Sequence, residues 1–284
     1  MDVRPRRSVL YMPGSNARAL EKARGIAADA LILDLEDAVA PDAKETARAQ
    51  VCDAVAAKGF GKREVIVRVN GPSTAWGEAD FAAALAARPD AILVPKVSTL
   101  QELHRCEYLM GESDIALWIM VETPLAILNV ANLAAGGGRL EGFVMGTNDL
   151  IKELRGLHTP DRANLAAALG LSVAAARANG LAAIDGVFND IQDADGFAAQ
   201  CRQARSFGFD GKTLIHPSQV APCNAVFAPS PDEVEAARKV IAAFDLPENE
   251  GKGAIKLDGR MVELLHAEIA RRTVAMADAI RALA

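Results

Sequence analysis

The sequence of 284 residues predicts a (β/α)8 TIM barrel with a C-terminal helical extension. Short, nearly continuous apolar runs alternate eight times with amphipathic segments over roughly the first 220 residues. Most of these runs end in polar or turn residues. The remaining tail of about 55 residues exceeds what closure of a barrel needs. We therefore expect a barrel domain over residues 1–228 and an extension over residues 229–284.

The expected strands have apolar character on both faces, as parallel strands covered by helices require. An open doubly wound sheet is the alternative, but it usually has fewer strands and a Gly-rich first turn. In chain order the expected strands are SVLYMPG (8–14), ALILDLED (30–37), VIVRVN (65–70), AILVPK (91–96), IALWIMVET (115–123), GFVMGTND (142–149), LAAIDGVF (181–188) and GKTLIHP (211–217).

The segments between the strands have helical periodicity, with Ala, Leu, Ile and Val on one face. Residues 16–27, 41–58 and 161–180 are examples, and Gly180 is a natural stop for the last of these. The helix that follows the fourth strand has Ser98 or Thr99 as its N-cap, with Glu102 placed for a capping box.

The tail predicts two further helices, over residues 231–245 and 261–284. Residues 246–259 between them are rich in Gly, Pro and charge, which favours a loop. The last helix has an apolar stripe through Leu264, Leu265, Ile269 and Met276. We expect this extension to pack on a neighbouring copy of the chain, or to cap one.

Composition narrows the function classes. With 51% hydrophobic and 24% charged residues, the chain can bury a large core. The net charge of −6 argues against general nucleic-acid binding, which needs a basic face. The four cysteines lie far apart, as free thiols in a reducing compartment do. No signal peptide or run long enough to span a bilayer is evident, so we expect a cytoplasmic protein.

Polar side chains gather at the predicted strand ends, where the active sites of such barrels lie. A structural barrel could end its strands in any turn residue. Convergence of so many charges on one rim is more informative, because like charges repel unless a cation or a substrate joins them. The residues at the strand ends are Asp34, Glu36, Asp37, Arg68, Asn70, Lys96, Glu122, Asn148, Asp149, Asp185, Lys212 and His216.

Two of these carboxylates form a candidate metal site. Strand pleating places Trp118, Met120 and Glu122 on one face, and Asp149 follows the adjacent sixth strand, ~4.8 Å away. Two carboxylates without histidine or thiolate suit Mg²⁺, which leaves its other positions to water and substrate. The simpler alternative is that Glu122 emerges into water where its strand ends.

Arg68 is the candidate anion-binding residue, because its planar guanidinium can bind a carboxylate or a developing oxyanion. An ion pair within the rim to Glu36 or Asp37 is the structural alternative. Arg18 and Lys22 lie four residues apart, on one face of a helix that could contact phosphate. An ordinary solvated helix has the same spacing.

The motifs RSVLYMPG, LILDLEDAV, VIVRVNG, LVPK, VETPLAIL, GTNDL, LIHPSQ and KLDGRMV occur in this order from Arg7 to about Met261. Together they resemble the citrate lyase β-subunit-like group of the HpcH/HpaI aldolase superfamily. Relatives in this group include citryl-CoA, malyl-CoA/β-methylmalyl-CoA and citramalyl-CoA lyases.

This resemblance implies roles for individual residues. It implies that Asp258 is an acid/base that reaches a neighbour's barrel within a homotrimer or hexamer. Glu36 and Asp37 would hold metal-bound water or orient Arg68. The implied ligands of Mg²⁺ or Mn²⁺ are Glu122 and Asp149. The implied substrate-binding residues are Arg68 and, through the metal, Glu122. The implied CoA contacts are Tyr11, Arg18, Lys22, Ile215 and His216.

The function implied is a Mg²⁺-dependent carbon–carbon lyase. It would cleave a 3-hydroxyacyl-CoA, such as malyl-, citramalyl- or citryl-CoA, to acetyl-CoA and a 2-keto acid. One alternative is a malyl-CoA-type thioesterase that hydrolyses the metal-held substrate. Another is a citrate lyase β-subunit that acts on an acyl-carrier-protein thioester, and a third is an aldolase that acts on hydroxy-diacids without CoA.

Overall fold

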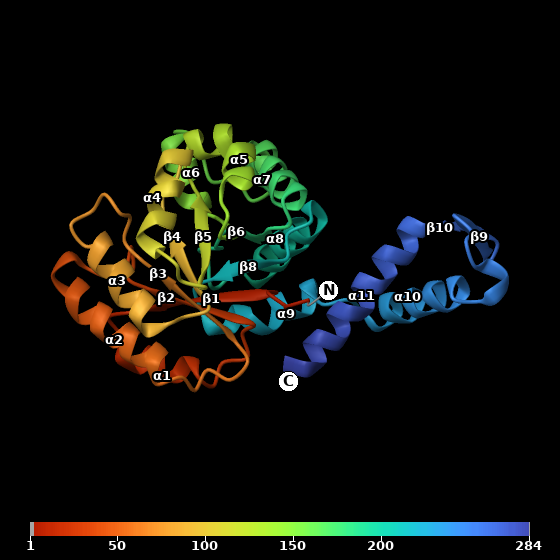
Figure 1. Cartoon of the computed structure of the whole chain (residues 1–284), viewed down its shortest axis with the longest axis horizontal. Coiled ribbons are helices and arrows are strands. Elements are labelled where there is room, and N and C mark those ends of the chain that lie inside the picture. Colours follow the sequence, from red (N-terminus) through yellow and green to blue (C-terminus); the bar gives the residue numbers. More distant parts are fainter. Residues whose placement is uncertain (1–2, 284) are drawn as a thin grey trace. The chain divides into compact units, whose positions relative to one another are not determined.

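The computed structural model describes residues 3–283 and contains a closed barrel of eight parallel strands (Figure 1). Each strand pairs with the next along the chain, and the first pairs with the eighth. The predicted (β/α)8 fold is therefore confirmed. The strands are β1 (Ser8–Pro13), β2 (Ala30–Asp34), β3 (Glu64–Arg68), β4 (Ala91–Val94), β5 (Ala116–Val121), β6 (Leu140–Met145), β7 (Ala182–Asp185) and β8 (Gly211–Leu214).

Helices surround the barrel on its outside (Figure 1). Thr99 is the N-cap before Leu100, and it forms the expected capping box with Glu102. The barrel helices are α1 (Ala17–Ala23), α2 (Lys44–Ala56), α3 (Gly77–Ala87), α4 (Leu100–Met110), α5 (Pro124–Gly136), α6 (Thr147–Glu153), α7 (Ala166–Ala178), α8 (Ala194–Phe207) and α9 (Val220–Phe227). The short 3-10 turns are η1 (Pro41–Ala43), η2 (Ala163–Leu165) and η3 (Pro217–Gln219).

Inward-facing side chains fill the barrel. Alternate residues of the strands, among them Ile32, Ile66, Trp118 and Met120, form one buried apolar cluster. A Cβ atom built on Gly142 would lie 2.7 Å from the Trp118 ring, so only glycine leaves room for the indole here. The predicted shared face of Trp118, Met120 and Glu122 therefore points into the barrel, and it ends at the carboxylate.

A buried ionic network ties the end of β7 to its surroundings. Asp185 receives hydrogen bonds from Arg162 at 2.8 Å and from Lys212 at 2.8 Å, and all three side chains are almost fully buried. Lys212 also donates to the side chain of Gln200 on α8. Asp185 and Lys212, two of the predicted strand-end charges, thus serve the packing of helices against strands.

The C-terminal residues form a second compact unit, which comprises residues 226–283 together with residues 3–5; the barrel unit comprises residues 6–225. The unit contains α10 (Pro231–Phe244), η4 (Pro247–Asn249), β9 (Ala254–Leu257), β10 (Arg260–Glu263) and α11 (Leu264–Leu283). α10 and α11 pack side by side (Figure 1).

The prediction of a loop over residues 246–259 is wrong for the second half of this segment, because β9 and β10 form an antiparallel hairpin. Leu257 pairs with Arg260, so the turn consists of Asp258 and Gly259 alone. Both have positive φ, 47° and 80°, as a tight two-residue hairpin turn requires. Asp-Gly is a strong hairpin signal, and the surrounding charges obscured it.

Two of the compositional expectations can be compared with the structure. All four cysteines are free thiols, as predicted. Among the described residues, no helix has the length and apolar character needed to cross a membrane.

Candidate active site

A cavity of about 320 Å³ opens at the C-terminal ends of the barrel strands. It brings together six of the twelve strand-end residues that the sequence singled out, and its lining comes from β1, β2, β3, β5 and β8 and from the loops that follow β6 and β7. Its lining includes Tyr11, Asp34, Asp37, Arg68, Met120, Glu122, Asn148, Asp149, Asn189, Thr213 and Ile215.

Glu122 directly follows β5 and is only 1% exposed, so it does not simply emerge into water. Its Oε1 accepts a hydrogen bond of 2.8 Å from the backbone N–H of Lys96. Thr123 then caps α5, and Pro124 occupies the first turn of that helix, where its missing N–H costs nothing. The strand end and the helix start together fix the carboxylate.

Gly146 makes room for this carboxylate. A Cβ atom built on Gly146 would lie 2.3 Å from both Cβ and Oε2 of Glu122. Because real Cβ atoms do not approach other atoms so closely, the glycine of the GTND segment is required by the position of Glu122.

The electrostatic surroundings of Glu122 favour a cation. Burial, together with the negative charges of Glu36 and Asp149, raises the pKa of Glu122 to about 8, although Arg68 opposes this rise. Negative charge therefore accumulates around a buried carboxyl group. A divalent cation beside Glu122 would offset this charge.

Asp149 does not lie at a strand end as predicted. β6 stops at Met145, and Asp149 belongs to the first turn of α6. It nevertheless lines the same cavity as Glu122. Among residues 3–283 there is no group of three or more His, Cys, Asp or Glu side chains that could hold a metal ion. Glu122 and Asp149 are the two carboxylates of this cavity that could hold Mg²⁺, with water or substrate in its remaining positions.

Arg68, at the end of β3, is buried and held by a fork. Its Nε and Nη2 donate to the two oxygens of Asp34 at 2.6 and 2.7 Å. The third nitrogen, Nη1, lies 2.9 Å from Glu36 and 3.8 Å from Asp37. The ring of Tyr11 lies 4.8 Å from the guanidinium carbon. The alternative of an ion pair within the rim is thus present, but its main partner is Asp34.

The predicted CoA contacts are spread over several elements. Tyr11 and Ile215 line the cavity. His216 is exposed, and its Nδ1 accepts a hydrogen bond from the backbone of Ser218 at the start of η3. Arg18 and Lys22 lie exposed on α1 and are not part of the cavity lining.

Asp258 lies in the turn of the β9–β10 hairpin, in the C-terminal unit. It is exposed, and it is the only predicted catalytic residue that does not belong to the barrel unit.

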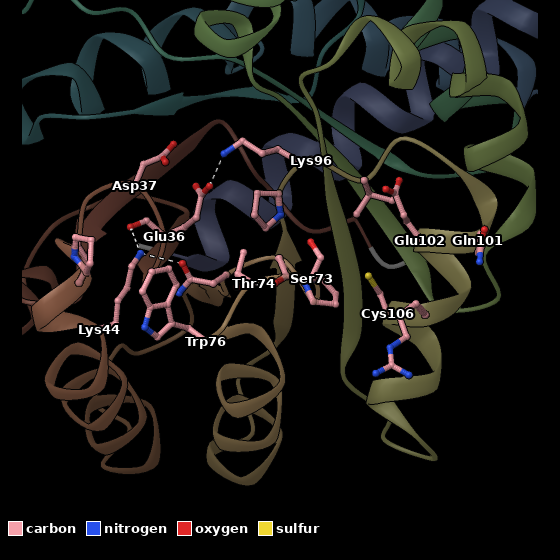
Figure 2. Close-up of a pocket in the computed structure, with 18 residues that line it drawn as sticks. Glu36, Asp37, Lys44, Ser73, Thr74, Trp76, Lys96, Gln101, Glu102 and Cys106 are labelled. Atoms are coloured by element: carbon pink, nitrogen blue, oxygen red, sulfur yellow. Dashed lines mark hydrogen bonds and ion pairs between the residues drawn. The ribbon is translucent and has the colours of Figure 1, made fainter.

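A second cavity of about 640 Å³ adjoins the rim between the loops that follow β2, β3 and β4 (Figure 2). Its wall includes Glu36, Asp37, Trp76 and Lys96. Figure 2 shows Lys96 and Glu36 pointing toward each other, and their Nζ and Oε1 atoms lie 2.7 Å apart.

The sequence identified both Asp34 and Lys96 as strand-end residues but assigned neither a partner. The parallel register places Asp34 directly beside Arg68, which could have identified the fork. The contacts of Lys96 depend on a left-handed backbone conformation, with a φ of 59°, that the sequence does not signal.

The family model described as HpcH/HpaI aldolase/citrate lyase matches residues 7–217. A (3S)-malyl-CoA thioesterase of Cereibacter sphaeroides is 53% identical over 278 residues, which cover 98% of this chain and 96% of that protein. The citrate lyase subunit beta of Escherichia coli is 35% identical over 269 residues, which cover 92% of this chain and 89% of that protein.

A solved structure is also similar over nearly the whole chain. The protein CitE from Mycobacterium tuberculosis, in complex with magnesium, acetoacetate and coenzyme A, has a TM-score of 0.74 and 30% identity. The match covers 95% of this chain and 97% of that one.

These relatives correct the expected reaction. The prediction that the main activity is that of a carbon–carbon lyase is wrong, because the relatives at 51–53% identity over almost the full chain are thioesterases. The residues expected to bind a metal and an anion would suit either reaction, so strand-end motifs alone do not separate cleavage from hydrolysis. The resemblance itself is confirmed: the chain is an enzyme of the HpcH/HpaI aldolase/citrate lyase family and belongs to its citrate lyase β-subunit-like group.

Proposed function

We propose that this enzyme is a thioesterase that hydrolyses a short 3-hydroxyacyl-CoA diacid of the malyl-CoA type. Water adds to the thioester carbonyl carbon, the C–S bond breaks, and the products are a free hydroxy-diacid and the thiol of CoA. The single observation that carries this proposal is the 53% identity to a (3S)-malyl-CoA thioesterase over 98% of the chain.

Glu122 and Asp149 would hold Mg²⁺, or Mn²⁺ in its place, at the buried end of the cavity. The fit rests on two neighbouring carboxylates, one of which has a pKa raised by burial and by surrounding negative charge. When bound, such an ion supplies a Lewis acid that polarises the oxygens of the substrate.

Arg68 would bind the anionic part of the substrate or the oxyanion that develops at the carbonyl. Asp34 holds two of its nitrogens and so fixes the plane of the guanidinium before substrate arrives. Glu36 and Asp37 would orient Arg68 from its other edge. This preorganisation avoids reorientation of the donor during the reaction.

Coenzyme A would enter along β1 and β8, past Tyr11 and Ile215, which line the cavity. His216 would contact it beyond the rim, and the exposed cations Arg18 and Lys22 would bind its phosphates. Asp258 would act as the acid/base that handles the proton of the attacking water.

The proposal is tested by incubating the full chain with (3S)-malyl-CoA and Mg²⁺ and following free thiol with a disulfide reagent. Hydrolysis releases the CoA thiol, whereas carbon–carbon cleavage leaves the sulfur acylated as acetyl-CoA. Malate and free thiol should form in equal amounts. Glyoxylate and acetyl-CoA without free thiol would overturn the proposal.

The same assay separates a second candidate. The 35% identity to a citrate lyase subunit beta leaves an acyl-carrier-protein thioester as an alternative substrate. A chain that is inert on CoA thioesters and active only with a charged carrier protein would favour that alternative.

A further inference from the structure

One nitrogen of Arg68, Nη1, forms no short hydrogen bond within residues 3–283, although it lies 2.9 Å from Glu36. Asp34 takes Nε and Nη2 through two short hydrogen bonds. Within residues 3–283, Nη1 donates one hydrogen bond, to the sulfur of Met120. This bond is long, at 3.5 Å, and a thioether sulfur is a weak acceptor. Nη1 therefore has donor capacity left, and Arg68 lines the cavity that Glu122 also lines.

Glu36 lies close enough to remove this capacity. Its Oε2 is 2.9 Å from Nη1, an ion-pair distance, yet in the described part of the chain this buried oxygen accepts no hydrogen bond. A small rotation of the carboxylate would turn the contact into a charge-assisted hydrogen bond. Nη1 would then be occupied before substrate arrives.

Lys96 opposes this rotation. Its Nζ donates to the other oxygen of Glu36 at 2.7 Å, from the side of the larger cavity (Figure 2). Its backbone is held in the left-handed region, which is strained for a residue with a side chain. The backbone N–H donates to Glu122, so the main chain and the side chain of one residue contact two carboxylates of the site.

We propose that Lys96 is a positioning residue that holds Glu36 in an orientation that pairs with the charge of Arg68 but accepts no hydrogen bond from Nη1, and so keeps this donor available for the anionic substrate. The proposal rests on the proposed function in one respect, namely that the ligand of Nη1 is the carboxylate or oxyanion of a hydroxyacyl compound. Lys96 itself touches neither substrate nor reacting atoms; it acts through Glu36.

The test uses four variants of the full chain: Lys96→Met, Lys96→Arg, Glu36→Gln and the double variant Lys96→Met with Glu36→Gln. Without Nζ, Glu36 should compete with substrate for Nη1. We expect Lys96→Met to raise KM for (3S)-malyl-CoA at least tenfold, the equivalent of one charge-assisted hydrogen bond, with a smaller change in kcat. Lys96→Arg keeps the cation and should stay within about threefold of the wild type.

The double variant decides the mechanism. Once Glu36 has lost its charge, the loss of Lys96 should change KM by less than about threefold, because little competition remains. Mn²⁺ affinity, measured by calorimetry, should stay within about twofold in Lys96→Met, since the backbone N–H to Glu122 is kept. An equal effect of Lys96→Met with and without Glu36→Gln would overturn the proposal.

A crystal structure of Lys96→Met keeps this inference separate from the proposed function, because it needs no substrate. It should show Glu36 hydrogen-bonded to Nη1 of Arg68. An unmoved Glu36 would refute the positioning role even if the enzyme is a thioesterase. A moved Glu36 in a chain that does not hydrolyse malyl-CoA would support the role and refute the proposed function alone.

Discussion

At the scale of single residues, the central feature of the candidate site is one buried carboxyl group, that of Glu122. Glu122 is 1% exposed, and burial together with Glu36 and Asp149 raises its pKa to about 8. The proposed metal ligation therefore has a direct consequence for substitution at this position.

Glu122→Gln should weaken Mn²⁺ binding by at least tenfold, because the metal loses one of two carboxylate ligands. Isothermal titration calorimetry measures this without a turnover assay. The metal-free protein should become no less stable at pH 7, since a carboxyl group with a pKa of about 8 is mostly neutral there, as the amide is. Glu112→Gln, at an exposed glutamate, is the matched control. Unchanged Mn²⁺ affinity in Glu122→Gln would refute the ligand assignment.

At the scale of elements, the loop between β6 and α6 shapes the site as much as the charged side chains do. Gly146 has space for no side chain, because a Cβ atom there would overlap with Glu122. Asp149 reaches the cavity from the first turn of the helix that this glycine precedes.

Gly146→Ala should therefore displace Glu122 and lower both metal affinity and turnover at least tenfold. The control is Gly170→Ala in α7, where a new Cβ meets nothing within 4 Å. That change should leave activity intact and stabilise the fold by about 0.5 to 1 kcal/mol. Full metal affinity in Gly146→Ala would show that the glycine has no role in placing the carboxylate.

The ionic network of β7 and β8 gives a prediction on pH. Burial alone raises the pKa of Asp185, but Lys212 and Arg162 outweigh it and hold the pKa below its usual value of 3.8. A carboxyl group with a depressed pKa in the folded state adds stability above its unfolded value, and this stability is lost as the pH falls through the folded value.

Asp185→Asn should thus destabilise the protein at pH 7 by about 3 to 5 kcal/mol, because two buried cations lose their anion. The difference from the wild type should stay constant down to about pH 4 and shrink below it. Urea unfolding at several pH values measures this. Asp114→Asn, in an exposed pair with Arg88, should change stability by less than about 1 kcal/mol at any pH. A pH-independent difference between Asp185→Asn and the wild type down to pH 2 would contradict the assignment.

The sequence predicted the elements better than it predicted their contacts. Eight strands in order follow from the alternation of apolar runs and amphipathic segments, which is a property of local periodicity. Asp149 was assigned to a strand end because periodicity does not show that β6 stops at Met145. The pairing of Asp34 with Arg68 depends on strand register, and the contacts of Lys96 depend on one unusual backbone angle, so neither follows from residue types alone.

At the scale of the whole molecule, the C-terminal unit exposes apolar side chains that need a partner. Met261, Leu264, Leu265 and Ile269 are 50 to 73% exposed. Such a group is unusual on a protein that works as a single chain. We expect a homotrimer or hexamer, in which light scattering would give three or six times the 29.9 kDa of one chain.

If Asp258 serves the barrel of a neighbouring copy, two inactive variants should complement each other. Chains with Glu122→Gln and chains with Asp258→Asn, co-expressed with different tags and purified as mixed oligomers, should recover up to about a quarter of the wild-type rate. The control is a mixture of chains with Glu122→Gln and chains with Asp149→Asn. Both variants are defective in the barrel, so this mixture should recover no activity. Mixed oligomers that remain inactive would place the whole site in one chain.

The two cavities at the rim share Asp37, whose side chain is 60% exposed. An inhibitor that occupies the catalytic cavity can therefore be extended past this carboxylate into the larger hollow beside Trp76, with a basic group placed to pair with Asp37. Such a compound would gain selectivity over enzymes that share the metal and the arginine but have a different loop after β3. The larger hollow thus offers inhibitor design a surface outside the cavity that Arg68 and Glu122 line.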